Sequence, residues 1–230
     1  SLDINSNPKI DKVLDRTFEL YEHCFSYASK KKKEILFEVG TEEQSGVTNT
    51  YEETEYFLNK LSKFCKRNNL PKLFFIVLQS GTKVMETRNI GTFESLVRIK
   101  NEIPAEIQIF KIKKICKKYK VKFIVNDDPF LAKKLNADGC HLGQKDMNIP
   151  DARKLLKNKI IGATCHNSLK LVKKAIEEKV NYIALGAFYS TKTKKVKYKA
   201  TIQLLTLVKK ITNIPIVAIG GIKLENYEKL

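Results

Sequence analysis

Residues 121–146 read VKFIVNDDPFLAKKLNADGCHLGQKD, and this stretch decides the fold. The largely apolar run 121–125 is bounded by charge, which predicts a strand buried on both faces. The run ends in Asn-Asp-Asp and then a proline, which can occupy the first turn of a helix. Residues 129–136 have helical spacing, and residues 138–142 form a second short strand. Strand, helix and strand therefore follow one another within this single stretch.

Carboxylates follow both of these predicted strands. Asp127 comes just after the first strand, and Asp146 comes four residues after the second. The C-terminal ends of parallel strands open on one face of a sheet or barrel, and ligand sites collect there. We expect Asp127 and Asp146 to face each other across that mouth and to hold a hard cation. Helix capping or simple hydration is the alternative role for each acid.

The rest of the chain alternates between short apolar runs and helical patterns. Strands are predicted at residues 34–39, 73–78, 121–125, 138–142, 159–164, 182–188 and 216–219. Helices are predicted at residues 10–28, 51–68, 105–119, 129–136, 150–157, 168–179 and 201–211, with another starting near residue 224. Residues 82–103 show no clear pattern. Such alternation indicates βαβ units and a parallel sheet.

An α/β fold of the (βα)8 barrel type fits this order best. About seven βα units are recognisable, so we expect an incomplete barrel that lacks the last strand. An open doubly wound sheet is the alternative. The length of 230 residues favours a single barrel-like domain spanning residues 1–230.

Composition limits the classes of partner and compartment. No apolar run reaches about 18 residues, so we expect no membrane contact. The five cysteines are scattered and odd in number, which indicates reduced thiols and a cytoplasmic location. The net charge of +18 is typical of nucleic-acid binding, but the excess is lysine spread along the chain without an aromatic-basic recognition motif. We therefore expect a solvated lysine-rich surface and no nucleic-acid partner. The sequence indicates no oligomeric state.

Polar residues also follow the later strands. They are Thr164, the Thr-Lys-Thr-Lys run at residues 191–194, and the glycine pair at 220–221. Hydroxyls, backbone N–H groups, lysines and two acids together suit the binding of phosphates through a divalent metal. Taken alone, the lysine-threonine run reads as a surface loop and the glycine pair as a turn. His141 lies inside a strand and is expected to be a packed core imidazole, and no Cys-His or Ser-His pairing is indicated.

Four motifs then resemble one family. Residues from about 111 to 230 resemble the thiamine phosphate synthase family, including its TenI-like relatives, through FIVNDDPFLAKKLNADGCHLGQKD, IIGATCHNS, YIALGAFYSTKTK and IPIVAIGGI, in the family's order. The resemblance implies a (βα)8 barrel that joins hydroxymethylpyrimidine diphosphate to a thiazole phosphate. It also implies release of pyrophosphate and a Mg²⁺ cofactor bound to that leaving group. Phosphorylated heterocycles would be the small-molecule partners.

The resemblance assigns roles to individual residues. The predicted magnesium ligands are Asp127 and Asp146. Thr164, at a position where the family often has Ser, and Lys194 are the candidate catalytic residues, and both also bind substrate near the diphosphate. The remaining substrate-binding residues are Asn126 for the diphosphate, and Thr191, Thr193 and Gly221 for the thiazole phosphate. Asp128 receives no role.

The first half of the chain resembles something else. Three segments, FEVGTEEQSG, LQSGTKVMETRNIGTFES and IPAEIQIFK, are similar to the non-catalytic subunit of class II tagatose-bisphosphate aldolases, and they cover parts of about the first 110 residues. The change of resemblance falls within a predicted helix, so we expect one hybrid barrel with halves 1–110 and 111–230. The family's Gln-x-Arg-x-Lys segment is not found ahead of residue 121. Two alternatives therefore stay open: a non-catalytic, TenI-like phosphate-ligand binder, and an accessory subunit of such an aldolase.

Overall fold

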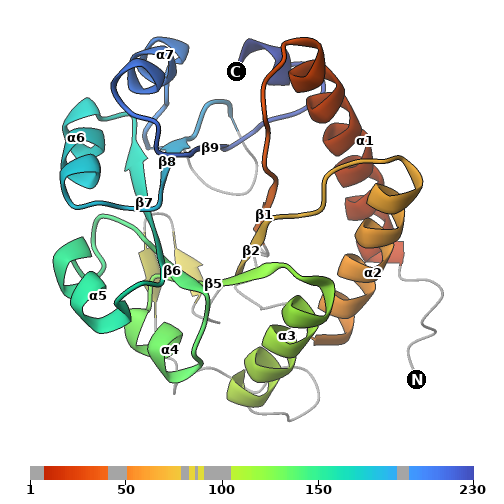
Figure 1. The fold of residues 1–230 in the computed structure, drawn as a ribbon, viewed down its shortest axis with the longest axis horizontal. Coiled ribbons are helices and arrows are strands. Elements are labelled where there is room, and N and C mark those ends of the chain that lie inside the picture. The colour runs from red at the N-terminus through yellow and green to blue at the C-terminus, as the bar shows by residue number, and fades with distance from the viewer. Residues whose placement is uncertain (1–7, 41–50, 79–82, 86–87, 91–104, 191–196) are drawn as a thin grey trace.

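A computed structural model describes residues 8–40, 51–78, 83–85, 88–90, 105–190 and 197–230. Seven parallel strands form one curled sheet in the order β1-β2-β5-β6-β7-β8-β9 (Figure 1). They are β1 (Glu38–Gly40), β2 (Phe75–Leu78), β5 (Lys122–Asn126), β6 (Gly139–Leu142), β7 (Ile160–His166), β8 (Tyr182–Gly186) and β9 (Ile216–Ile219). Within these described ranges β1 and β9 are the two edges of the sheet. The prediction of a barrel-type α/β fold with seven strands is confirmed.

Helices surround the sheet on its outer side (Figure 1). They are α1 (Pro8–Lys30), α2 (Tyr51–Arg67), α3 (Ala105–Tyr119), α4 (Pro129–Lys134), α5 (Ile149–Leu156), α6 (Leu169–Glu177) and α7 (Ile202–Ile211). Two elements differ from the sequence prediction. A hairpin of β3 (Lys83–Met85) and β4 (Arg88–Ile90) lies where no pattern was visible, because three-residue strands are too short to show one. The helix expected near residue 224 is only a 3₁₀ turn, η2 (Tyr227–Lys229).

Side chains of each strand alternate between the helices and the barrel interior, as a pleated backbone requires. The helix-facing set forms the main core and includes Ile76, Phe123, Cys140, Ile161 and Ile183, each at most 1% exposed. The interior set begins with an apolar cluster made of Phe75, Val77, Ile124 and Tyr182. Strand β2 pairs with β5, so described residues of both halves of the chain share this sheet.

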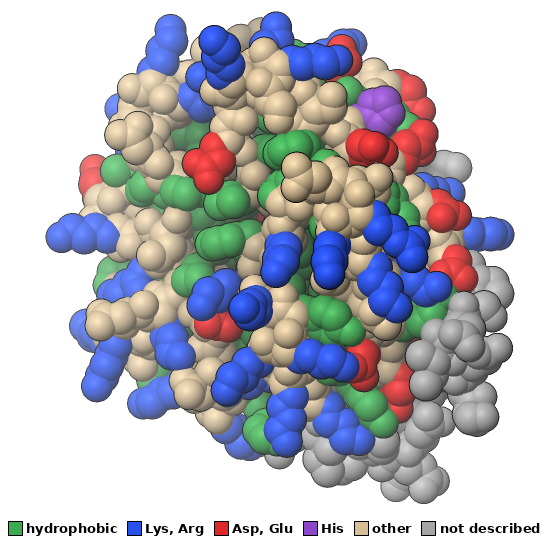
Figure 2. Space-filling view, turned by 45° about the vertical axis from the view of Figure 1, so that its right-hand side comes forward, with side chains coloured by type: hydrophobic (Ala, Val, Ile, Leu, Met, Phe, Trp, Pro, Cys, Tyr) green, Lys and Arg blue, Asp and Glu red, His purple; other side chains and the backbone are tan. Residues whose placement is uncertain are grey.

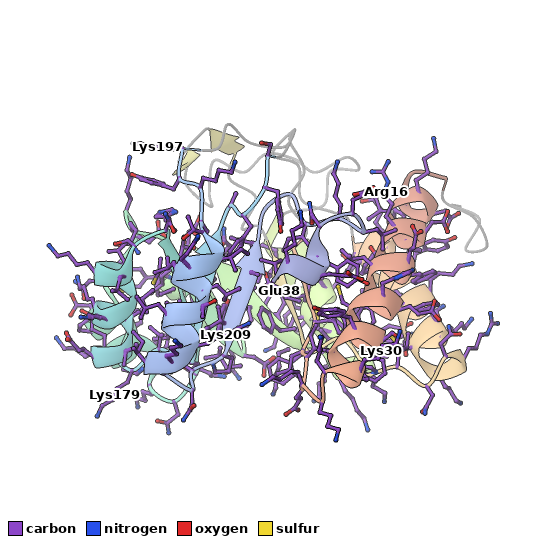
Figure 3. All side chains as sticks on the ribbon, turned by 90° about the horizontal axis from the view of Figure 1, so that it is seen from above. Arg16, Lys30, Glu38, Lys179, Lys197 and Lys209 are labelled. Atoms are coloured by element: carbon purple, nitrogen blue, oxygen red, sulfur yellow. The ribbon has the colours of Figure 1, made fainter. Side chains whose placement is uncertain are left out.

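The C-terminal ends of the strands lie at one end of the barrel. In Figure 3, Lys197, which follows β8, lies at the upper edge, and Lys179, which precedes β8, lies at the lower edge. The upper edge therefore holds the C-terminal ends of the strands.

Lysine and arginine side chains are scattered over the face shown in Figure 2, as expected for a dispersed positive charge. In the described part of the chain no helix is long and apolar enough to cross a bilayer.

Candidate active site

The two adjacent acids after β5 have different structural tasks. The carboxylate of Asp128 accepts a 2.9 Å hydrogen bond from the backbone N–H of Leu131 and caps helix α4. Asp127 has a left-handed backbone with φ of 65°, and its N–H donates to the carbonyl oxygen of His141 over 2.7 Å. The alternative role of helix capping therefore belongs to Asp128, and the Asp127 side chain follows the strand end without serving as the cap.

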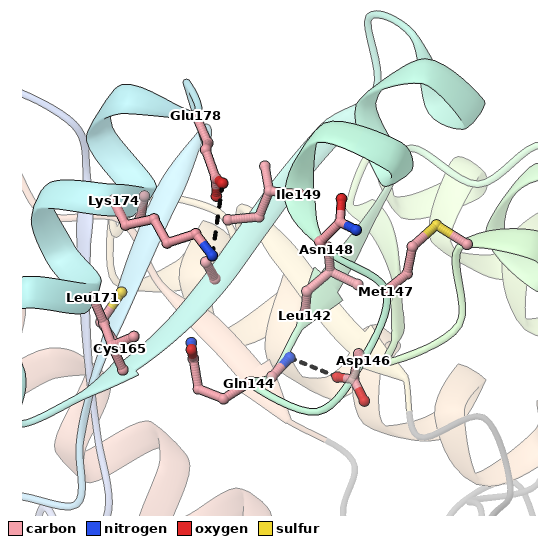
Figure 4. A pocket seen from close by; sticks show the side chains of 13 residues that line it. Leu142, Gln144, Asp146, Met147, Asn148, Ile149, Cys165, Leu171, Lys174 and Glu178 are labelled. Atoms are coloured by element: carbon pink, nitrogen blue, oxygen red, sulfur yellow. Dashed lines mark hydrogen bonds and ion pairs between the residues drawn. The ribbon is translucent and has the colours of Figure 1, made fainter.

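Asp146 is held by the loop that follows β6. Its Oδ2 accepts a 2.6 Å hydrogen bond from the backbone N–H of Gly143 (Figure 4). Burial raises the pKa of the Cys140 thiol well above its ordinary value, and the charges of Asp127, Asp128 and Asp146 raise that pKa further. The backbone of Asp127 is bonded to His141 in β6, and the carboxylate of Asp146 is bonded to Gly143 directly after β6, so both residues lie around the end of this strand. That the two carboxylates face each other across one mouth stays a prediction.

A polar layer lies in the barrel interior above the apolar cluster. Asn126, His141 and Thr164 are interior residues at the C-terminal ends of β5, β6 and β7, and the sheet register sets Asn126 beside His141. Asn126 is 8% exposed. Each strand thus contributes an apolar or glycine residue below and a polar side chain above. Such a layer at the strand ends is where a barrel enzyme binds its ligand.

His141 is the centre of this layer, although its place within a strand predicted only a packed core imidazole. Its Nδ1 is 2.8 Å from the hydroxyl oxygen of Tyr182, and its Nε2 is 2.7 Å from Oγ1 of Thr164. Burial lowers the pKa of His141 to about 4, so the ring is neutral near pH 7. The period-two alternation of β6 and β7 was the signal that could have placed His141 beside Thr164.

Thr164 is positioned by both its side chain and its backbone. Besides the bond to His141, its carbonyl oxygen accepts a hydrogen bond from Nε2 of Gln144, in the loop that carries Asp146. The pairing of β7 with β8 shifts between Thr164 and His166, which marks a bulge at this strand end. Bulges re-aim side chains and are frequent beside active sites. Thr164 is therefore linked to the same mouth as the predicted metal ligands.

The glycine pair after β9 lies beside the segment that follows β8. Gly220 and Gly221 have φ of 91° and 67°, a region where a side chain is strained. A Cβ atom on Gly221 would lie 2.5 Å from the carbonyl oxygen of Ser190, so this turn lies directly against the segment after β8. Thr191, Thr193 and Lys194 continue that segment and lie outside the described residues.

A cavity of about 100 Å³ lies beside Asp146, between the β6–α5 and β7–α6 units (Figure 4). Lys174 and Glu178 line its far end, with Nζ and Oε1 3.9 Å apart. Sites for small organic ligands usually enclose about 300–1,000 Å³. This cavity is therefore too small to hold two phosphorylated heterocycles, and the mouth of the barrel is the candidate site.

Comparisons with known proteins agree with this geometry. The family model for thiamine monophosphate synthase matches residues 63–230 of the chain. The chain belongs to the thiamine monophosphate synthase family. A thiamine-phosphate synthase of Pelagibacter ubique is 62% identical over 178 residues, covering 75% of this chain and 84% of that protein. One from Nitrosomonas eutropha is 38% identical over 164 residues, covering 71% of this chain and 74% of that protein.

A solved structure shares the fold of this synthase-family chain. Thiamine phosphate pyrophosphorylase from Pyrococcus furiosus superposes with a TM-score of 0.59 at 22% identity, covering 83% of this chain and 77% of that one. The predicted family is confirmed, and the match begins at residue 63 rather than near 111. It therefore overlaps residues 63–110 of the half that resembles an aldolase subunit. The division of the barrel into two halves stays a prediction.

The site of this family member is thus assembled only in part from the predicted residues. Asn126, Asp127, Asp146 and Thr164 lie at neighbouring strand ends, and Gly221 lies at the end of β9. Among the described residues no group of three or more His, Cys, Asp or Glu side chains has the arrangement of a metal site. The individual roles of these residues remain predictions.

Proposed function

We propose that this chain is a thiamine-phosphate synthase that joins hydroxymethylpyrimidine diphosphate to a thiazole phosphate and releases pyrophosphate. The observation that carries the proposal is the 62% identity to a thiamine-phosphate synthase over 75% of the chain. At such identity the reacting groups of the site are expected to be shared. The comparisons favour this reaction over a non-catalytic phosphate-ligand binder and over an aldolase accessory subunit.

The residues of the mouth suit a magnesium ion. Mg²⁺ usually binds through one or two carboxylates and completes its shell with water and substrate phosphates. Asp127 and Asp146 offer that donor set, since Asp127 is bonded to His141 in β6 and Asp146 is bonded to Gly143 directly after β6. Within the described chain Oδ1 of Asp146 takes no hydrogen bond, so it is available to a ligand. When bound, the ion would neutralise charge on the diphosphate leaving group.

The other residues bind and orient the two substrates. We assign Asn126, Thr164 and Lys194 to the diphosphate, and Thr191, Thr193 and the backbone N–H of Gly221 to the thiazole phosphate. If the C–O bond to the diphosphate breaks early, negative charge grows on the departing group. Hydrogen bonds to the diphosphate become stronger as this charge grows. They lower the activation barrier, because they stabilise the transition state more than the ground state. No covalent nucleophile is then required.

Proton transfer by His141 is not part of this mechanism. Both ring nitrogens are engaged, with Tyr182 and with Thr164. Because burial holds the His141 pKa at about 4, the ring has little tendency to take a proton near pH 7.

We also propose a cytoplasmic location, since all five cysteines are free thiols in the structure.

Thiamine phosphate formation from the two purified substrates tests this proposal. Asp127→Asn removes the charge of a predicted metal ligand, and we expect kcat/KM to fall by about 100-fold or more. Asp128→Asn is the matched control, because Asn also caps helices and the neighbouring charge is lost in the same loop. It is expected to keep activity within about threefold, since a charge that touches no substrate contributes little.

Two results would contradict the proposal. Wild-type activity in Asp127→Asn, or equal losses in the Asp127 and Asp128 variants, would remove the metal role of Asp127. Tight binding of the thiazole phosphate by the wild-type chain without any turnover would instead indicate a non-catalytic binder.

A further inference from the structure

A continuous row of polar side chains runs through the barrel interior from β8 to β7. The Tyr182 hydroxyl meets Nδ1 of His141 at 2.8 Å, and Nε2 of the same ring meets Thr164 Oγ1 at 2.7 Å. The Tyr182 and His141 rings are stacked with centroids 5.4 Å apart. The row begins in the apolar interior cluster and ends at the strand-end mouth. Tyr182 and Thr164 are therefore connected through the single ring of His141.

Room for Tyr182 is provided by a glycine on the neighbouring strand. The sheet register sets Gly162 opposite Tyr182, and a Cβ atom on Gly162 would lie 2.0 Å from Cζ of the tyrosine ring. Phe75 packs on another side of the ring, with centroids 5.1 Å apart. Tyr182 is only 4% exposed. The Tyr182 ring is thus held in place by its packing, and this packing positions its hydroxyl next to His141.

The proton arrangement along the row follows from the ligand at its end. Diphosphate oxygens only accept hydrogen bonds, so a threonine hydroxyl that binds them must donate its proton outward. The Thr164 oxygen then accepts from Nε2–H of His141, and Nδ1 of the neutral ring accepts from Tyr182. Burial raises the pKa of Tyr182 well above its ordinary value, and the charge of Glu38 raises it further. The phenol therefore stays protonated and serves as the donor.

We propose that Tyr182 is a positioning residue for diphosphate departure: its hydroxyl holds the His141 ring so that Nε2–H orients Thr164 to donate to the leaving group. This inference rests on the proposed synthase function. It adds a residue that makes no contact with substrate and that lies one layer below the site.

A purely structural role predicts a different outcome. A buried polar row can be replaced by apolar groups of similar shape at little cost in stability. Loss of the Tyr182 hydroxyl alone leaves Nδ1 of His141 without its partner, so a purely structural role would lower stability but leave the reaction unaffected. If Tyr182 acts through Thr164, its effect must instead disappear once the Thr164 hydroxyl has been removed. This dependence is a coupling between two residues that only a double-mutant cycle reveals.

The experiment measures kcat and KM for the pyrimidine diphosphate in Tyr182→Phe, Thr164→Val and the double variant. We expect Tyr182→Phe to lower kcat by about tenfold, the usual size of one lost hydrogen bond, with less than about twofold change in KM. In the Thr164→Val background the same substitution is expected to have no further effect on kcat. Tyr21→Phe is the control, because Tyr21 is equally buried and donates to the Pro71 carbonyl at 2.8 Å on the outer side of the barrel. It should keep wild-type kcat.

Each outcome decides one statement. Additive losses in the double variant, or wild-type kcat in Tyr182→Phe, would overturn the positioning role while the synthase function stands. A comparable fall in Tyr21→Phe would attribute the effect to general loss of stability, which also overturns it. Absence of thiamine phosphate formation by the wild-type chain would contradict the proposed function itself, a result separate from the comparison among variants.

Discussion

The backbone N–H of Asp127 donates a 2.7 Å hydrogen bond to the carbonyl oxygen of His141, which ties the end of β5 to the adjacent strand. This bond continues the sheet one residue beyond the regular pairing, whose last matched pair is Asn126 with His141. To make it, Asp127 takes a left-handed backbone, with φ of 65°. The conformation turns the chain out of the strand at the point where the predicted metal ligand must face the mouth.

Because the backbone of Asp127 is left-handed, two substitutions at this position are expected to differ in their free energy of unfolding. Asn visits this region readily, whereas a residue without a short polar side chain pays about 1 kcal/mol or more. We expect Asp127→Ala to be less stable than Asp127→Asn by about 1 kcal/mol, while both lose activity equally. Urea unfolding of the two variants, beside the activity assay, measures this difference. Equal stabilities would show that the backbone conformation at this position costs nothing.

Gly162 is expected to tolerate no side chain while the Tyr182 ring is in place. A methyl group there would lie 2.0 Å from the Tyr182 ring, so Gly162→Ala should lower the free energy of unfolding by about 2 kcal/mol or more. Tyr182→Leu removes the obstructing ring, and the alanine methyl then fills part of the space left. We therefore expect Gly162→Ala to cost much less in the Tyr182→Leu background. Strictly additive losses in a double-mutant cycle by chemical unfolding would contradict this packing relation.

The sequence predicts those site residues that directly follow an apolar run. Asn126 and Asp127 stand at the junction of a strand and a helix start, where the one-dimensional pattern alone fixes their place at the mouth. Thr164 is the last residue of the apolar run 159–164, and Asp146 lies in the loop four residues after the run 138–142, so both are also predicted near the strand ends. Tyr182 is not predicted as a site residue, because it opens an apolar strand and looks like an ordinary core residue. Its partner is set by the pairing of Gly162 with Tyr182, and strand register between distant segments is not written in local periodicity.

Short or irregular elements escape prediction for a related reason. The hairpin of β3 and β4 has three residues per strand, too few for an alternation to appear. The bulge between Thr164 and His166 shifts the pairing by one residue, which a regular pattern does not anticipate. By contrast, α3 was predicted with the observed limits, Ala105–Tyr119, because its apolar positions recur at helical spacing.

Arg153 stabilises the barrel at the end opposite to the site. Its guanidinium donates to the carbonyl oxygens of Lys157 and Lys159 at 2.8 and 2.6 Å, and to Oδ1 of Asn181 at 2.9 Å. These contacts join the segments that lead into β7 and β8. Arg153→Met removes the donors and leaves the carbonyl groups without them, so we expect unfolding to become easier by about 2 kcal/mol. At this end of a barrel a residue serves stability rather than catalysis, and kcat should be unchanged.

The neighbouring Lys154→Met provides the control for Arg153. Lys154 forms an exposed ion pair with Asp151, and such pairs contribute little in water. The thermal midpoint of the Lys154→Met variant is expected to match that of the wild type. A loss of kcat in Arg153→Met at a temperature where the variant is fully folded would show that this end of the barrel reaches the chemistry.

His141 makes the stability of the protein depend on pH. Burial lowers its pKa from an ordinary value of 6.5 to about 4, so the unfolded chain binds more protons than the folded chain between these values. Stability from this group is fully present above about pH 6.5 and is lost as the pH falls toward 4. The loss amounts to at most about 3.5 kcal/mol, from about 1.4 kcal/mol for each pH unit between the two pKa values.

Urea unfolding at pH 7, 5.5 and 4.5 measures this dependence in the wild type and in His141→Asn. Burial, and secondarily the charge of Lys197, also lower the pKa of His166, so the wild-type curve contains both histidines. The difference between wild type and variant isolates His141, because His166 is present in each. We expect this difference to shrink by about 2 kcal/mol between pH 7 and pH 4.5. A constant difference would mean that the His141 ring is protonated equally easily in the folded and unfolded chains, and that the polar row it joins is open to water.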